Sequence, residues 1–200
     1  MQYHSEEVDT KSGEIWFGLF PEQPGQFELK PAKVTISLVN DPIVDDPDQK
    51  TGKKVSIPST DEPLSLVRGV AGLKAGGVTT CVARTERLTS GQRVKLKLGS
   101  SEATLIVTGT KQKDQEMQSD YALILERDGV RQKLYSKKEI GSDLSQILLW
   151  SGDLDRDGKV DLLIDTTEHY NMSRPTLFLS SKAKPGKLVE KVASRTSVGC

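Results

Sequence analysis

The chain has 200 residues, of which 35% are hydrophobic and 28% charged, so it carries enough apolar material for a folded core. Its 28 Lys and Arg residues balance 28 Asp and Glu residues, which leaves no general basic excess to attract nucleic acid or an acidic membrane surface. No segment reaches the roughly 20 consecutive apolar residues of a membrane-spanning helix. We therefore expect no nucleic-acid partner and no membrane span.

The first segment of the chain, residues 1–12, is polar and acidic. This composition predicts a flexible N-terminus and differs from a signal peptide, which needs an apolar stretch. The protein is then either cytoplasmic or an exported protein whose leader peptide is absent from this chain. Cys81 and Cys200 are the only two cysteines. A disulfide between them would favour export, and two unrelated thiols fit the sequence equally well.

Residues 13–141 read as a β region. Trp16, Phe17 and Phe20 predict buried core, with a sugar- or peptide-stacking surface as the alternative. Asp128-Gly129 predicts a tight hairpin turn, because both central residues of a type I′ turn need positive φ. Runs of alternating apolar and polar residues predict strands at 33–38, 93–98, 105–107, 121–125 and 130–135. The one helical expectation is a single turn over residues 142–146.

Two loops and one strand face in this region are weaker candidates for a site. Residues 40–54 carry four aspartates that could hold an ion, but their irregular spacing favours a solvated loop. Residues 69–77 are rich in glycine and lack the Gly-Lys-Ser/Thr ending of a phosphate-binding loop. Arg93, Lys95 and Lys97 form a basic stripe, which favours the solvated face of a sheet over an anion site.

The last unit, residues 142–200, contains the motif that carries chemistry. From Trp150 the sequence reads W-S-G-D-L-D-R-D-G-K-V-D-L-L-I-D. A loop that coils around an ion points alternate side chains inward, and Gly158 permits the sharp turn. We expect the Lys159 backbone carbonyl to act as a further ligand. Carboxylate ligands are predicted at alternate positions, namely Asp153, Asp155, Asp157 and Asp161.

These oxygen ligands predict Ca²⁺, which takes six to eight of them, rather than Mg²⁺, which demands a stricter octahedron. The segment is not an EF-hand, because β-type sequence flanks it and Ile164 stands where an EF-hand needs glutamate. A solvated Asp-Gly hairpin is the alternative, although it would not require regularly spaced aspartates. The similar hairpin at Asp128-Gly129 lacks those aspartates and is expected to bind nothing.

The loop resembles the FG-GAP or VCBS-type repeat, the calcium-loop unit of integrin α-chain β-propellers and of many secreted bacterial proteins. The shared run is Gly152-Asp153-x-Asp155-x-Asp157-Gly158-x-x-Asp161, followed by the apolar residues 162–164. The likeness covers about residues 147–193, including an expected strand at 175–181 and a turn at Pro185-Gly186. The resemblance implies a structural Ca²⁺ and a location outside the cytoplasm. A single copy of the loop argues against a complete propeller, which needs several blades.

We therefore expect an all-β protein of antiparallel sheets, of the sandwich or partial-barrel type, with a C-terminal calcium-loop hairpin unit. The leading functional hypothesis is an exported, calcium-stabilised binding or structural module for an unknown protein or glycan ligand, located in the periplasm, outside the cell or on its surface. The alternative is a calcium-dependent hydrolase acting on glycans. His169 is the one candidate general base, and no orienting partner for it can be identified from the sequence.

Overall fold

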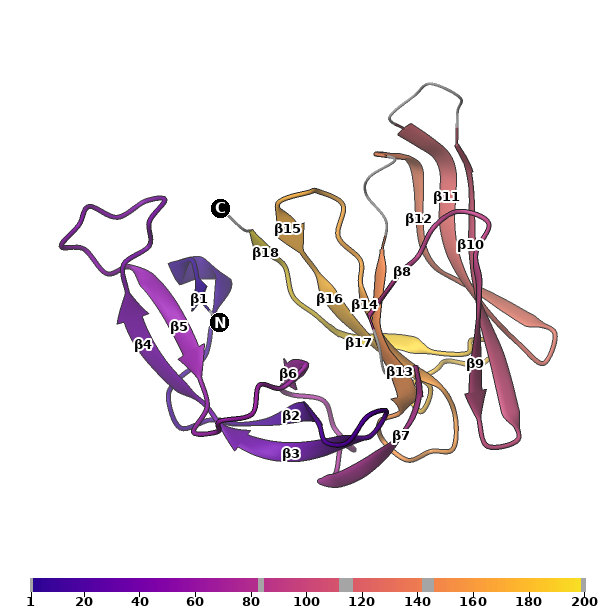
Figure 1. Cartoon of the computed structure of the whole chain (residues 1–200), viewed down its shortest axis with the longest axis horizontal. Helices are drawn as coiled ribbons and strands as arrows, with labels where there is room; N and C mark the ends of the chain where they lie inside the picture. The colour runs from indigo at the N-terminus through magenta and orange to yellow at the C-terminus, as the bar shows by residue number, and fades with distance from the viewer. Residues whose placement is uncertain (1, 83–84, 112–116, 142–145, 199–200) are drawn as a thin grey trace.

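Short alternating runs of apolar and polar residues fold into antiparallel strands throughout the described part of the chain (Figure 1). The computed structural model describes residues 2–82, 85–111, 117–141 and 146–198. Within these ranges there is no α-helix, only the 3₁₀ turn η1 (Ser5–Glu7). The predicted all-β class is confirmed. The helical turn expected to start at Ser142 falls on residues 142–145, which lie outside the described ranges.

The largest sheet has nine strands in the order β17-β16-β14-β13-β7-β3-β2-β6, with β8 also paired to β13. Its strands come from both halves of the chain. In chain order they are β2 (Ile15–Pro21), β3 (Phe27–Lys33), β6 (Ser65–Val67), β7 (Gly76–Val82), β8 (Glu86–Arg87), β13 (Ile147–Asp153), β14 (Asp161–Asp165), β16 (Pro175–Leu179) and β17 (Glu190–Ser194). The antiparallel pairing of β13 with β7 joins residues 142–200 to the preceding β region. The predicted division at residue 141 is therefore not a division between sheets.

One face of this sheet curls around its own core. Val67 on the edge strand β6 belongs to the same buried cluster as Leu177 on β16, near the other edge. Trp150 lies in that cluster, fully buried, with its ring edge-on to Phe27 at 6.4 Å between centroids. Because residues from both ends of one sheet share a core, the sheet forms an incomplete barrel in which β6 and β17 are the two edges.

The opposite face of the sheet packs against a four-stranded meander. The meander consists of β9 (Arg93–Leu98), β10 (Ser101–Lys111), β11 (Met117–Arg127) and β12 (Val130–Gly141). The second core contains Leu96 and Leu123 from the meander together with Leu162 from β14. Strand β14 is buried on both faces, since its next residue, Leu163, lies in the barrel core. This explains its unbroken apolar run.

The predicted hairpin between β11 and β12 is present. Asp128 and Gly129 have φ angles of 50° and 76°, as a type I′ turn requires. Two smaller sheets complete the fold, namely β1 (Gln2–Tyr3), β5 (Gly52–Ser56) and β4 (Thr35–Val39), and the pair β15 (Met172–Ser173) and β18 (Ser197–Val198). None of the described residues forms a helix long and apolar enough to cross a membrane.

The N-terminal segment, for which the sequence predicts flexibility, has specific partners in the structure. Strand β1 pairs with β5, and Val8 is 3% exposed in a core that also contains Trp16. Phe20 is 4% exposed, so the expectation of a core role for these aromatic residues is confirmed. The acidic sequence does not reveal this docking, because one buried valine anchors an otherwise polar segment.

His4 attaches the N-terminal segment to the loop at residues 40–54. Its Nδ1 lies 2.5 Å from Oδ2 of the buried Asp41, and this hydrogen bond raises the pKa of His4 above its ordinary 6.5, with smaller contributions from the Asp41 and Glu7 charges. Because the pKa of His4 is higher in the folded protein than in the unfolded chain, the His4–Asp41 contact stabilises the fold fully at pH values below the unfolded pKa. This stabilisation is lost as the pH rises through the folded pKa.

We therefore expect the backbone amides of β1 and β5 to exchange faster at pH 8.5 than at pH 5.5, after correction for the intrinsic pH dependence of exchange. Native-state hydrogen exchange measures this directly. The His4→Gln variant should lose the pH dependence. Equal corrected protection of the wild type at both pH values would show that the contact contributes nothing.

Candidate metal centre

The aspartate-rich loop connects two central strands of the nine-stranded sheet. It runs from the end of β13 at Asp153 to the start of β14 at Asp161, and the β13–β14 register pairs Gly152 with Asp161. This register places the first and last predicted ligands at the base of one hairpin. Asp161 is completely buried and Asp153 is 8% exposed. Strand pairing therefore brings two carboxylates into the interior.

The loop closes on these two carboxylates through backbone hydrogen bonds. The backbone N–H groups of Asp157 and Gly158 donate to the two carboxylate oxygens of Asp153, at 3.0 and 2.9 Å. The N–H of Leu154 donates to Oδ2 of Asp161 at 2.8 Å. Gly158 has a φ of 81°, so the sharp turn predicted at this glycine is present.

Three of the four predicted carboxylates converge. One oxygen from each of Asp153, Asp155 and Asp161 lies within 4.8 Å of the others. Oδ1 of Asp155 is buried and has no hydrogen-bond partner among the described residues. A buried, unsatisfied carboxylate oxygen is costly. Its position beside two further carboxylates fits a cation with hard oxygen ligands, so the donor set agrees with Ca²⁺.

Asp157 lies outside this converging group, which differs from the four-carboxylate arrangement expected from the spacing. The Ser180 hydroxyl oxygen lies 2.9 Å from both of its carboxylate oxygens, and Oδ1 accepts a hydrogen bond from the N–H of Lys159. Alternation alone does not direct its side chain inward, because the left-handed conformation of Arg156, with φ at 64°, interrupts the coil. The Lys159 side chain is exposed, as its predicted role through the backbone carbonyl allows.

Two serines that sequence reasoning missed lie against the loop. The backbone N–H and hydroxyl of Ser180 both donate to Oδ1 of Asp161, at 2.8 and 3.0 Å. The Ser181 hydroxyl donates to Oδ2 of Asp155. Both serines directly follow β16, and the pairing of β16 with β14 carries them to the loop. In the sequence both serines fall inside the expected strand at 175–181, whereas β16 ends before them at Leu179.

Arg156 fixes the outer side of the loop. Its guanidinium donates to the carbonyl oxygens of Ala75 at 3.0 Å and Gly77 at 3.3 Å. Through these hydrogen bonds the glycine-rich segment 69–77 supports the β13–β14 loop. Asp165, at the far end of β14, takes no part, since its carboxylate accepts hydrogen bonds from Thr167 and Arg174.

Burial and mutual repulsion act on the converging carboxylates. Burial raises the pKa of Asp161 to about 7, with a further contribution from the charge of Asp155, against the opposing hydrogen bonds from Ser180 and Leu154. Burial also raises the pKa of Asp153. Ionising several buried carboxylates that lie close together costs free energy, and a bound divalent cation would remove that cost.

The other acidic loop is held by internal hydrogen bonds. Asp45 accepts from the backbone N–H and hydroxyl of Thr51 at 2.7 and 2.6 Å, and from the N–H of Asp41 at 2.8 Å. Within the described ranges, the converging aspartates of the β13–β14 loop are the one group of acidic, histidine or cysteine side chains close enough to hold a metal. Residues 40–54, for which the sequence favours a solvated loop, are held by the Asp45 hydrogen bonds.

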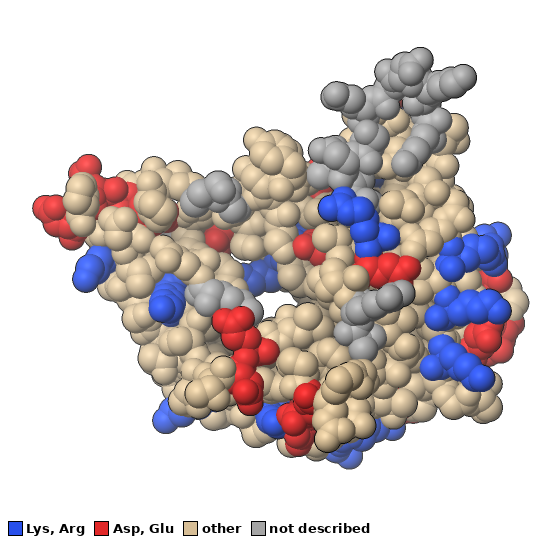
Figure 2. Space-filling view, in the orientation of Figure 1, with Lys and Arg blue, Asp and Glu red and all other residues tan. Residues whose placement is uncertain are grey.

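The basic stripe lies on the solvent-facing side of the four-stranded sheet. Arg93, Lys95 and Lys97 are exposed while the residues between them are buried. Arg93 and Lys95 lie within ion-pair distance of Glu126 and Glu102. Figure 2 shows blue and red side chains intermixed on this side of the molecule. The stripe therefore lies on the solvated face of the sheet, as the sequence favoured.

His169 is exposed on the segment between β14 and β15 and has a partner that the sequence did not reveal. Its Nδ1 lies 2.5 Å from the side-chain oxygen of Asn171, and its ring lies 4.5 Å from that of Tyr170. Among the described residues, no carboxylate forms an ion pair with it. This arrangement orients the imidazole without supplying a charged partner.

Cys81 carries a free thiol on β7, half-buried against the core between the two sheets. Burial, together with the nearby charges of Asp153 and Asp161, raises the pKa of this thiol to about 11. Cys200, the other half of the disulfide considered from the sequence, lies outside the described residues. Cys81 contributes apolar surface behind the β13–β14 loop.

Comparisons of the chain with protein-family models, with curated proteins and with solved structures gave no match.

Proposed function

We propose that the β13–β14 loop binds one Ca²⁺ ion and that the protein is a calcium-stabilised binding or structural module of the FG-GAP or VCBS type. The observation that supports this most strongly is the buried, unpartnered Oδ1 of Asp155 beside the carboxylates of Asp153 and Asp161. Three carboxylates supply hard, anionic ligands, and backbone carbonyls and water can complete the six to eight oxygens that Ca²⁺ takes.

The position of the loop indicates what the ion would do. Asp161 begins β14, the strand buried between both cores. Ion binding would therefore hold the start of the most buried strand against β13 and against Ser180. In this proposal the ion is structural, and the weak sites typical of extracellular calcium modules suit a protein that works outside the cytoplasm. The ligand of the module would be a protein or a glycan.

Thermal unfolding tests the proposal. An ion that binds the folded loop and not the unfolded chain stabilises the fold by about 2.7 kcal/mol when its concentration is 100 times Kd. For a domain of this size that corresponds to a rise in Tm of roughly 5–10 °C. We expect added Ca²⁺ to raise the Tm, a chelator to lower it, and Mg²⁺ to do much less. A Tm that is indifferent to both calcium and chelator would contradict the proposal.

A further inference from the structure

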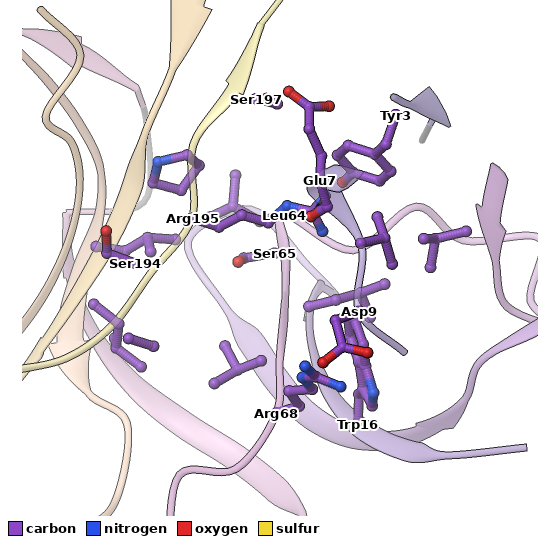
Figure 3. Close-up of a pocket in the computed structure, with 18 residues that line it drawn as sticks. Tyr3, Glu7, Asp9, Trp16, Leu64, Ser65, Arg68, Ser194, Arg195 and Ser197 are labelled. Carbon is purple, nitrogen blue, oxygen red and sulfur yellow. Dashed lines mark hydrogen bonds between the residues drawn. The ribbon is translucent and has the colours of Figure 1, made fainter. Parts of the chain in front are cut away.

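A pocket of about 390 Å³ opens on the concave side of the incomplete barrel, away from the metal loop. Its lining includes Ser65 and Leu66 on β6 and Ser194 on β17, the two edge strands of the nine-stranded sheet. The pocket therefore occupies the gap where the barrel fails to close. Figure 2 shows an opening near the centre of the molecule, and Figure 3 shows the lining side chains. A volume of this size suits a small organic group.

Arg195 is the unusual residue of this pocket. Its guanidinium stacks on the Tyr3 ring at 3.7 Å, and its NH2 donates to the Glu7 carbonyl oxygen at 2.7 Å. No other hydrogen bond joins the guanidinium to a described residue, and its Nε is buried without a partner. No carboxylate among the described residues lies within ion-pair distance of it. Half-buried charges are normally paired, but no described carboxylate contacts this guanidinium, and the Glu7 charge acts on it only without direct contact.

A structural role explains only part of this arrangement. Arg195 and the nearby hydrogen bond from the Val198 N–H to Glu7 hold the C-terminal segment against the N-terminal one. That clamp uses one N–H group and one face of the guanidinium. The remaining donors belong to a planar group whose geometry matches a carboxylate.

The opposite wall of the pocket is aromatic and already positioned. The indole Nε1 of Trp16 donates to Glu14 at 3.1 Å, and Arg68 both pairs with Glu14 at 3.2 Å and lies 5.6 Å from the Trp16 ring. Leu163 and Leu177 add apolar lining from β14 and β16. A ligand would therefore contact an apolar surface of fixed shape beside the Arg195 guanidinium, which has N–H groups available to donate.

The charged residues that line the pocket limit the negative charge that a ligand can carry. Arg68 and Arg195 are balanced by Glu7 and Asp9, so the pocket as a whole has no strong positive potential. A phosphate or a polyanion would be repelled by the two acidic residues. A single carboxylate, held locally at Arg195, would not need a general positive field.

We propose that the pocket between β6 and β17 binds an apolar molecule through one carboxylate, with Arg195 as the carboxylate-binding residue and Trp16, Leu163 and Leu177 against its apolar part. Such a group is found on a free small carboxylic acid and at the C-terminus of a peptide. This site does not depend on the metal centre.

Calorimetric titration of the whole protein in calcium-containing buffer tests the proposal. The probes are 4-phenylbutanoate, the peptide acetyl-Ala-Leu-Phe with a free carboxylate, and the amide of each. We expect at least one acid to bind at least tenfold more tightly than its amide, because a hydrogen bond to a charged group contributes roughly 1.5–3 kcal/mol. Tighter binding of the small acid or of the peptide acid identifies the source of the carboxylate.

Variants locate the site. Arg195→Gln should weaken binding of the acid at least tenfold and leave the amide unaffected, whereas Arg131→Gln, the same change on the four-stranded sheet, should alter neither. Acid binding should also change the tryptophan fluorescence of the wild type, and not that of Trp16→Phe.

Equal affinity for acid and amide, absence of binding by both acids, or full affinity in a folded Arg195→Gln variant would each overturn the proposal. If Arg195→Gln does not fold, the comparison of acid with amide binding by the wild type still tests whether the pocket recognises a carboxylate. Because the melting response to calcium is measured separately, failure here does not affect the metal proposal.

Discussion

Replacing Asp155 with asparagine is expected to have opposite effects on stability with and without calcium. Without the ion, the variant should melt at the same temperature as the wild type or slightly above it, because the Asp155 charge contributes to the raised pKa values of Asp153 and Asp161. Asparagine also keeps an oxygen that can accept from Ser181. With saturating calcium, the variant should melt roughly 5–10 °C below the wild type, since it loses most of the ion's stabilisation.

The matched control is Asp128→Asn in the hairpin between β11 and β12. Asp128 occupies a similar Arg-Asp-Gly turn, its side chain is 89% exposed, and asparagine tolerates its positive φ of 50°. This variant should keep the full calcium response. The account fails if Asp155→Asn destabilises the protein equally in calcium and in chelator, because the Asp155 carboxylate would then act only through its hydrogen bond.

Truncation of Trp150 to alanine is expected to cost about 3–5 kcal/mol, the usual range for a large buried aromatic residue. Its side chain is fully buried in the barrel core, contacts Phe27 edge-on and donates from Nε1 to the Thr80 hydroxyl at 3.2 Å. A domain of this size should lose roughly 10–15 °C in Tm. Chemical denaturation in urea, monitored by circular dichroism, measures the free energy directly.

Tyr170→Ala provides the corresponding surface control, because Tyr170 is 80% exposed. It should change the free energy of unfolding by no more than about 0.5 kcal/mol. A Trp150→Ala variant as stable as Tyr170→Ala would mean that the curled face of the large sheet is not a packed core. The partial-barrel description would then be incorrect.

The features that the sequence predicts well are local ones. The Asp-Gly hairpin, the alternating strand β9 and the turn at Gly158 each depend on a few neighbouring residues whose φ preferences or side-chain period are visible in the sequence. The doubly buried strand β14 is visible for the same reason, since an apolar run without alternation has no solvent-facing side.

The features that escaped prediction depend on strand register between distant segments. Ser180 reaches Asp161 only because β16 pairs with β14. Tyr3 and Arg195 meet from opposite ends of the chain, and neither residue type signals such a contact. Spacing within the motif therefore predicted a turn lined by aspartates, while pairing between strands determined which other side chains reach it.

Equilibrium dialysis of the wild-type protein against radioactive calcium, after exhaustive treatment with chelator, is the most direct test of the metal centre. The account predicts one Ca²⁺ ion bound per chain, at a site that a large excess of Mg²⁺ displaces poorly and that Asp155→Asn removes. Dialysis that finds no bound calcium at millimolar concentration, or equal binding by the wild type and Asp155→Asn, would contradict the assignment of the β13–β14 loop as a calcium site.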